Sequence, residues 1–240
     1  MSIPNYLETL SRFGLQQLQS GEADLTLDAN GNIARTRDGD WQMGSASVNA
    51  VFRLVERWRV TDKASRALFL HINDAESQAS VMAVEAAQQL ALHETRRYLE
   101  TQERIAALKE QSASFAGTVF VTLNSTLQRF RQDLGISESD AKWTSSGQLI
   151  QERSIAEIAS AASANFRHYD EWAAASTPNG LQLGSMRIIA KVLGCDVVDQ
   201  SGHPTLRTNV CDRMLAALCG GSPDVLAERM FGYCKAVADF

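Results

Sequence analysis

The sequence is poor in the residues that interrupt helices. Its 240 residues include four prolines, and none of them lies between Pro4 and Pro178. Proline disrupts a helix interior because it has no amide hydrogen and its ring clashes with the preceding turn. The long proline-free stretch therefore predicts long helices. The apolar content of 45% is enough to build a substantial core from them.

Cysteines are few and are confined to the last fifty residues. They lie between Cys195 and Cys234 without a CxxC pair, so we expect neither a disulfide framework nor a standard zinc site. His203 lies midway between Cys195 and Cys211, but these spacings are not those of known zinc ligands. We expect no metal.

The chain also lacks positive charge, long apolar runs and cofactor motifs. Its net charge of -5 gives no general field to attract nucleic acid, so any contact with RNA would have to be local. The sequence contains no signal peptide and no apolar run long enough to span a membrane, and we expect a cytoplasmic protein without a membrane partner. Without a phosphate-binding glycine loop, HExxH or GxSxG, no cofactor is expected.

Helical periodicity recurs along most of the chain. Apolar residues three and four positions apart predict helices over residues 5–19, 45–58, 63–72, 74–110, 119–134, 154–172, 185–193, 205–218 and 222–238. Residues 112–117 contain serine and glycine and are expected to interrupt the helical pattern. The helices on either side of this break are predicted to form a long antiparallel hairpin.

Residues 25–43 have strand character instead. Leu25 and Leu27 alternate with polar residues, and Asn30-Gly31 and Asp38-Gly39 are signals for tight turns. We therefore expect an all-α protein, a helical bundle with a long antiparallel helix hairpin and a small N-terminal β-hairpin. Residues 1–135 would hold the N-terminal helix, the small β-hairpin and the long helix hairpin. Residues 136–240 would hold the C-terminal helices that carry the Arg/His motif, and both parts would form one compact unit.

The segment over residues 154–172 has the densest set of reactive side chains. They are Asn165, Arg167, His168, Tyr169, Asp170, Glu171 and Trp172. A histidine can take up and release a proton near neutral pH, and an arginine can bind a phosphate through two parallel hydrogen bonds. His168 and Arg167 therefore suffice chemically for cleavage of a phosphodiester without a metal.

The neighbouring side chains have possible roles in the same reaction. Asn165 could orient a base or a phosphate, and Tyr169 or Trp172 could stack on a nucleobase. Asp170 or Glu171 could hold the imidazole in one tautomer. A second polar cluster, with Arg207 and Asn209, could supply another phosphate donor.

The same residues also have a purely structural interpretation. Arg167 and Glu171 could form a surface ion pair, Trp172 could anchor the end of the helix in the core, and His168 could satisfy a carbonyl group. Arg207 and Asn209 could serve the start of a helix. Both interpretations stay open at the level of sequence.

The segment from Asn165 to Trp172, NFRHYDEW, resembles the Arg/His segment of the HEPN superfamily. These are helical-bundle proteins of prokaryotic defence and toxin systems, many of which cut RNA as dimers. The resemblance implies a bacterial, metal-independent endoribonuclease with Arg167 and His168 as catalytic residues, acting on RNA as a homodimer. In the family the histidine usually follows the arginine by four to six residues, a spacing found here at Arg66 and His71.

Two other classes of function compete with this one. A partner-binding helical protein, such as an immunity, antitoxin or scaffold component, would use the long hairpin as a dimer interface. A DNA-binding protein is suggested by SMRIIAKVLGCD at residues 185–196, which resembles the first half of a helix-turn-helix motif. The next predicted helix then begins eleven positions after Gly194, at Thr205, instead of three or four.

Overall fold

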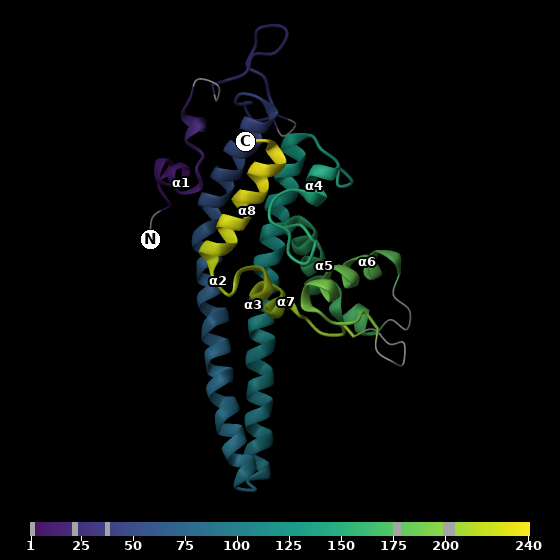
Figure 1. Cartoon of the computed structure of the whole chain (residues 1–240). Coiled ribbons are helices and arrows are strands. Elements are labelled where there is room, and N and C mark those ends of the chain that lie inside the picture. The colour runs from purple at the N-terminus through teal and green to yellow at the C-terminus, as the bar shows by residue number, and fades with distance from the viewer. Residues whose placement is uncertain (1–2, 21–23, 37–38, 175–178, 199–204) are drawn as a thin grey trace. The chain divides into compact units, whose positions relative to one another are not determined.

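The protein is all-α, as predicted. A computed structural model describes residues 3–20, 24–36, 39–174, 179–198 and 205–240. Within them, eight α-helices and one short 3-10 helix follow one another along the chain (Figure 1). They are α1 (Tyr6–Phe13), η1 (Gln16–Gln19), α2 (Ala46–Ala91), α3 (Thr95–Leu134), α4 (Ala141–Ser145), α5 (Ile155–Ala174), α6 (Gly180–Leu193), α7 (Cys211–Cys219) and α8 (Pro223–Ala238).

The contacts between residues divide the chain into two compact units, each assembled from separate segments. The first comprises Met1–Ala64, Thr122–Ile158 and Asp224–Phe240, and the second comprises Ser65–Val121 and Ala159–Pro223. Neither corresponds to residues 1–135 or 136–240. The reason is the length of α2 and α3, because each of these helices contributes one part to the first unit and another part to the second.

The long helix hairpin is present, but its turn lies elsewhere than the sequence indicated. Helix α2 has 46 residues and α3 has 40, and their distal parts run side by side in the second unit (Figure 1). The turn falls at residues 92–94, where His93 has a φ of 59° and the Glu94 amide donates to the Gln89 carbonyl. Bonds of this kind end helices. In spite of their length, no described helix is apolar enough to cross a membrane.

Residues 112–117 do not interrupt α3, contrary to expectation, because their small side chains serve packing. Ser112 is buried and its hydroxyl lies 3.1 Å from a carboxylate oxygen of Glu76 on α2. Gly117 is buried against the ring of Phe166 on α5. Small residues within a helix allow a neighbour to approach closely, so serine and glycine here mark contacts between helices.

The expected N-terminal β-hairpin is wrong as a pair of strands. Among the described residues of segment 24–44, only isolated bridges join Leu25 to Met43, Leu27 to Ile33 and Arg35 to Trp41. Instead, three short segments, around residues 26, 34 and 42, are joined to one another by backbone hydrogen bonds. The amide of Thr26 donates to Gln42, that of Gln42 to Ala34 and that of Ala34 to Thr26. Two backbone hydrogen bonds flank the single bridge of each pair of segments, and no second bridge follows it to make a ladder.

The turns of this segment follow the sequence signals. Gly31 and Gly39 have φ values of 80° and 87°, which glycine adopts without steric cost. A carboxylate oxygen of Asp28 accepts the amides of Asn30 and Asn32. These two hydrogen bonds lower the pKa of Asp28.

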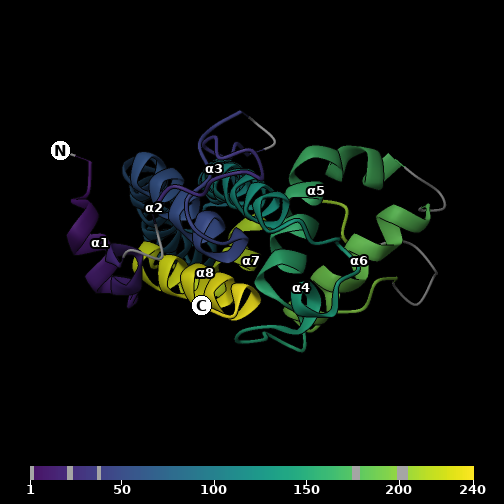
Figure 2. The same cartoon turned by 90° about the horizontal axis from the view of Figure 1, so that it is seen from above.

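The core of the first unit is built around α8. Seen from above, α8 lies between α1 and α4 (Figure 2). On the α1 side Phe231 stacks on Phe13 with 3.9 Å between ring centroids, and Trp58 meets both rings edge-on. On the α4 side the hydroxyl of Tyr233 donates to the Trp143 carbonyl at 2.5 Å. Burial raises the pKa of this hydroxyl far above its ordinary value.

Several helix ends differ from the predicted ones. Helix α1 ends before Gly14, whose φ is 63°, and Lys235 caps it by donating to the carbonyls of Phe13 and Gly14. Helix α6 begins five residues earlier than predicted and α7 begins later. By contrast, α5 and α8 lie where the periodicity placed them. Side chains from elsewhere in the chain act at the end of α1 and at the start of α7, whereas α6 begins at a capping box of its own.

Replacement of Gly117 tests the contact between α3 and α5. A Cβ atom at this position would lie 2.1 Å from Cδ2 of Phe166, so Gly117→Ala must displace the ring or the helix. We expect the free energy of unfolding to fall by about 1–3 kcal/mol, although alanine is the better helix former. Denaturant unfolding followed by circular dichroism measures it.

Gly184→Ala is the matched control. Gly184 is a helical glycine in α6 with nothing within 4 Å of the added Cβ, so this substitution should stabilise the protein by up to about 1 kcal/mol. If both variants gained stability equally, the close packing of Gly117 against Phe166 would be refuted.

Candidate functional site

Helix α5, which carries the reactive side chains, is well defined at its start. The Ser154 hydroxyl accepts the amide of Glu157 at 3.2 Å, and the Glu157 carboxylate accepts the amide of Ser154 at 3.0 Å. This reciprocal pair is a capping box, which satisfies two amides that have no partner within the helix. The start of α5 is thus set by its own sequence.

The buried face of α5 is the one that the periodicity predicted. Ile155, Ile158 and Ala162 are almost fully buried, and Phe166 packs against Gly117. Tyr169, one turn further on, is half-buried. This face packs α5 into the protein.

Asn165 lies in the core and links α5 to the start of α7. Its carboxamide nitrogen donates to the Thr208 carbonyl at 3.2 Å, and its oxygen accepts the Val210 amide at 3.0 Å. Its side chain is fully buried. The predicted contact of Asn165 with a base or phosphate is therefore not available in this structure. The carboxamide instead holds residues 208–210, which explains why α7 begins only at Cys211.

His168 and Glu171 form a pair at the surface of α5. The Nδ1 atom of His168 lies 3.1 Å from Oε1 of Glu171, one turn along the helix. The other ring nitrogen, Nε2, has no hydrogen-bond partner among the described residues. A carboxylate that holds Nδ1 selects the tautomer with its proton on Nδ1, which leaves Nε2 able to accept one.

The pair borders a cavity of about 280 Å³ between α5 and α6. Trp172, which is 2% exposed, forms part of its wall. The residues that line the cavity are Ala164, His168, Glu171 and Trp172 from α5 and Asn179, Leu181, Gln182 and Ser185 from α6 and its N-cap. Three of the predicted site residues are thereby brought together, and this cavity is the candidate functional site.

The remaining predicted residues of α5 do not line the cavity. Arg167 is exposed on another face of the helix, and its Nε donates to the Ser163 carbonyl at 3.1 Å. Asp170 is also exposed, and its carboxylate accepts the amide of Glu171. Successive residues of a helix diverge by about 100°, so Arg167 and His168 cannot face the same way.

Other candidate positions lie away from this cavity too. The Asn209 oxygen accepts the amide of Cys211, so Asn209 serves the start of α7 as the structural interpretation proposed. Arg207 is exposed and does not line the cavity. On α2, the ring of His71 stacks on Phe115 with 5.3 Å between centroids, and neither His71 nor Arg66 lines the cavity.

The contribution of α6 was missed from the sequence. Asn179 and Gln182 form a capping box in which the Asn179 oxygen accepts the amides of Leu181 and Gln182 at 3.0 Å. The Gln182 oxygen accepts the Asn179 amide at 2.8 Å. An asparagine followed three residues later by glutamine is a recognisable start signal, and it lies between the predicted helices of residues 154–172 and 185–193. It could have been identified.

The cysteines of the described chain are free thiols, three of them buried. Burial raises the pKa of Cys211 to about 12, and it also raises that of Cys234. Such thiols stay protonated and are poor nucleophiles and poor metal ligands. Among the described residues, no group of three histidine, cysteine or acidic side chains is placed to hold a metal ion.

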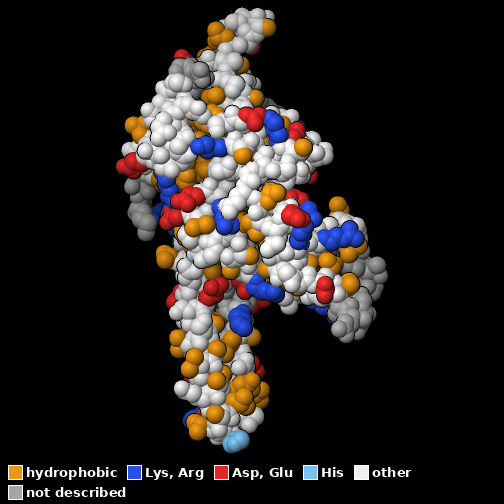
Figure 3. All heavy atoms as spheres, viewed as in Figure 1, with side chains coloured by type: hydrophobic (Ala, Val, Ile, Leu, Met, Phe, Trp, Pro, Cys, Tyr) orange, Lys and Arg blue, Asp and Glu red, His pale blue; other side chains and the backbone are white. Residues whose placement is uncertain are grey.

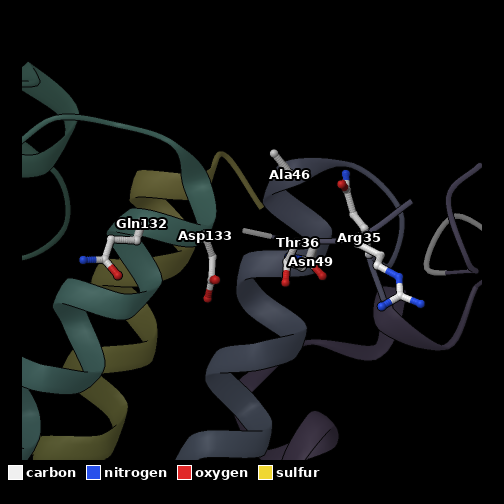
Figure 4. Close-up of a pocket in the computed structure, with 7 residues that line it drawn as sticks. Arg35, Thr36, Ala46, Asn49, Gln132 and Asp133 are labelled. Atoms are coloured by element: carbon white, nitrogen blue, oxygen red, sulfur yellow. The ribbon is translucent and has the colours of Figure 1, made fainter. Parts of the chain in front are cut away.

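A second cavity, of about 180 Å³, lies in the first unit (Figure 4). It is lined by Arg35, Thr36, Gln42, Ala46, Asn49, Gln132 and Asp133. The Asp133 carboxylate accepts from Arg57 at 2.6 Å and lies 3.6 Å from Nε of Arg53, which also bonds to Asp40 and Thr36. These charges neutralise one another and tie the N-terminal segment to α2 and α3, so we assign the cluster a structural role.

Comparison of the chain with protein-family models, with curated proteins and with solved structures finds no match. The function must therefore be argued from the cavity and the surface of the protein.

Replacement of Asn165 tests its structural role. Asn165→Ala leaves the buried Val210 amide and Thr208 carbonyl without their partner, and each such group costs about 1–3 kcal/mol. We expect the free energy of unfolding to fall by about 2 kcal/mol or more, measured by denaturant unfolding. Arg167→Ala is the control because its side chain is exposed, and it should change stability by less than about 0.5 kcal/mol. Equal effects of the two substitutions would contradict the assignment.

Proposed function

We propose that the protein is a HEPN-like, metal-independent ribonuclease whose active site is the cavity between α5 and α6. One observation carries the proposal. The imidazole of His168 borders the cavity with Nδ1 held by Glu171 and with Nε2 free. A histidine that borders a cavity and is held through one nitrogen by a carboxylate is the arrangement used for proton transfer in many enzymes.

The reaction that fits these groups uses the ribose itself as nucleophile. Nε2 of His168 takes the proton of a 2′-hydroxyl, and the 2′-oxygen attacks the adjacent phosphorus. The bond from phosphorus to the 5′-oxygen then breaks, and the imidazolium returns the proton to the leaving oxygen. The products are a 2′,3′-cyclic phosphate and a 5′-hydroxyl. Glu171 stabilises the imidazolium between the two transfers.

Arg167 takes a different role from the one implied by the family resemblance. It is exposed one residue before His168 and outside the cavity. In this position it attracts the RNA backbone beside the site and does not contact the reacting phosphate. Tyr169, Asp170, Arg207 and Asn209 have no part in the proposed chemistry.

The first test is cleavage of RNA by the purified protein in EDTA. We expect cleavage with a 2′,3′-cyclic phosphate end, because no metal takes part. His168→Ala should lower the rate by about 100-fold or more, the usual contribution of a general base. Arg167→Ala should lower it by about 10-fold or less, mainly through weaker RNA binding. A gel assay with end-labelled RNA measures both.

The two positions share a helix and are at least partly exposed, so thermal unfolding should be unchanged in both variants. This separates loss of chemistry from loss of fold. Wild-type protein that leaves RNA intact, or a His168→Ala variant as active as wild type, would reject the ribonuclease.

A second candidate function, a partner-binding helical protein, is favoured by the distal hairpin. Large aliphatic side chains are exposed there, with Val81 67% and Leu92 70% exposed. Apolar side chains gather on the distal hairpin (Figure 3). From Ser77 to Leu92 the sequence has a single charged residue, Glu85. Exposed apolar surface of this kind commonly binds other proteins, a second copy included.

Sedimentation velocity tests this candidate. If copies of the chain associate through the hairpin, wild type should show a concentration-dependent dimer that Val81→Lys with Val84→Lys abolishes. Gln102→Lys, on an exposed position of α3, should leave the dimer intact. A protein that is monomeric at all concentrations would argue against the homodimer.

A further inference from the structure

Segment 24–44 exposes its apolar side chains and turns polar ones inward. Leu27 is 61% exposed and Trp41 is 60% exposed. The hydroxyl of Thr36, in contrast, is half-buried and accepts a hydrogen bond from Arg53 on α2. An antiparallel segment that is covered on one side normally turns its apolar residues to the core. The reversal leaves an apolar surface exposed on this segment (Figure 3).

The backbone places six side chains of the segment on one face. Residues two positions apart in an extended segment point to the same side, and so do residues directly opposite in an antiparallel bridge. Each of the three bridges lies between two backbone hydrogen bonds, the arrangement in which opposed side chains are closest. The six side chains therefore form a ring, which we call the ring face, in the order Leu25, Leu27, Ile33, Arg35, Trp41 and Met43.

The ring face has opposite charges at opposite edges. Arg35 and Leu25 are three steps apart in either direction around the ring, and Asp24 directly precedes Leu25. The side chain of Arg35 points away from Asp133 and has no ion-pair partner among the described residues (Figure 4). One carboxylate oxygen of Asp24 accepts the Leu25 amide, and no described cation pairs with this carboxylate. Both charged side chains are exposed.

A face of this kind is complementary to itself. A two-fold axis that lies in the plane of the face, between its charged edges, turns one copy over onto another. Each Arg35 then lies opposite Asp24 of the other copy, and each Trp41 lies opposite Met43 of the other copy. The remaining pairs are aliphatic, so like surfaces meet in the middle and unlike charges meet at both edges.

A polyanion matches the ring face less well than a second copy does. Residues 24–44 include four aspartates and two arginines, so the segment repels RNA and acidic membranes. Trp41 is the one aromatic residue of the ring, and the aliphatic members offer no stacking platform for bases.

We propose that the ring face binds a second copy of the chain, in a two-fold symmetric dimer with apolar contacts and two ion pairs between Arg35 and Asp24. Six side chains from each copy make a small interface, since a standard one has roughly 20–30 residues on each side. Association is therefore weak and is expected at protein concentrations of about 100 μM. The inference does not depend on RNA cleavage, and its surface is distinct from the distal hairpin.

The test is sedimentation velocity on the full chain with Val81→Lys and Val84→Lys, which removes association through the distal hairpin. Both valines are exposed, so this parent protein should fold as wild type does. We expect it to show a concentration-dependent dimer. Addition of Trp41→Ser should weaken the dimer at least 10-fold, because the exposed indole lies in the interface.

Exchange of the two charges is the decisive step. In Arg35→Glu both edges of the ring face are negative, and in Asp24→Arg both are positive, so each variant alone should lose the dimer. An equimolar mixture restores opposite charges at both edges and should associate at least 10-fold more tightly than either variant alone. Lys63→Glu makes the same change of charge as Arg35→Glu at an exposed position of α2 and should leave the dimer intact.

Every outcome decides the inference. A parent protein that stays monomeric at all concentrations overturns it, and so does a dimer that neither charge variant weakens. A mixture of the two variants that stays monomeric overturns the two-fold pairing of Arg35 with Asp24. A dimer that is lost in each variant and recovered in the mixture supports it, whether or not the protein cleaves RNA.

Discussion

The buried carboxamide of Asn165 is the constraint on which the candidate site depends. Its two hydrogen bonds to residues 208 and 210, together with the buried apolar face of α5, orient the helix about its axis. Residues three and four positions apart share a helix face, so His168 and Trp172 follow Asn165 around the same side. That side meets α6 and encloses the cavity. The adjacent Arg167 is consequently turned away from it.

Small residues have opposite meanings in different parts of this chain. Gly31 and Gly39 form turns, as their sequence context indicates, because their positive φ suits glycine. Ser112 and Gly117 lie in an unbroken helix, where their size admits Glu76 and Phe166. The actual turn, at His93, contains no glycine. The local sequence does not distinguish these cases. Whether a small residue packs within a helix or forms a turn depends on its contacts with residues distant in the chain.

The candidate site was predictable in part. The density of reactive residues located α5, and His168, Glu171 and Trp172 do line one cavity. The sequence did not show that Asn165 would hydrogen-bond to residues 208 and 210, just before α7. It also did not show that Asn179 and Gln182 would line the opposite side of the cavity. Asn165 is separated from its partners by more than forty positions, and such contacts leave no periodic signal along the chain.

By itself, the sequence determined the helical class, the start of α5 and the position of α8, because capping, periodicity and the absence of proline act between neighbours in the chain. Tertiary structure decided where the hairpin turns, why segment 24–44 closes on itself without strands, and which faces of α5 are covered. These depend on side chains meeting across long separations. Whether a polar residue becomes a hydrogen-bond partner in the core or a group exposed to a ligand is settled by those contacts and not by the residue itself.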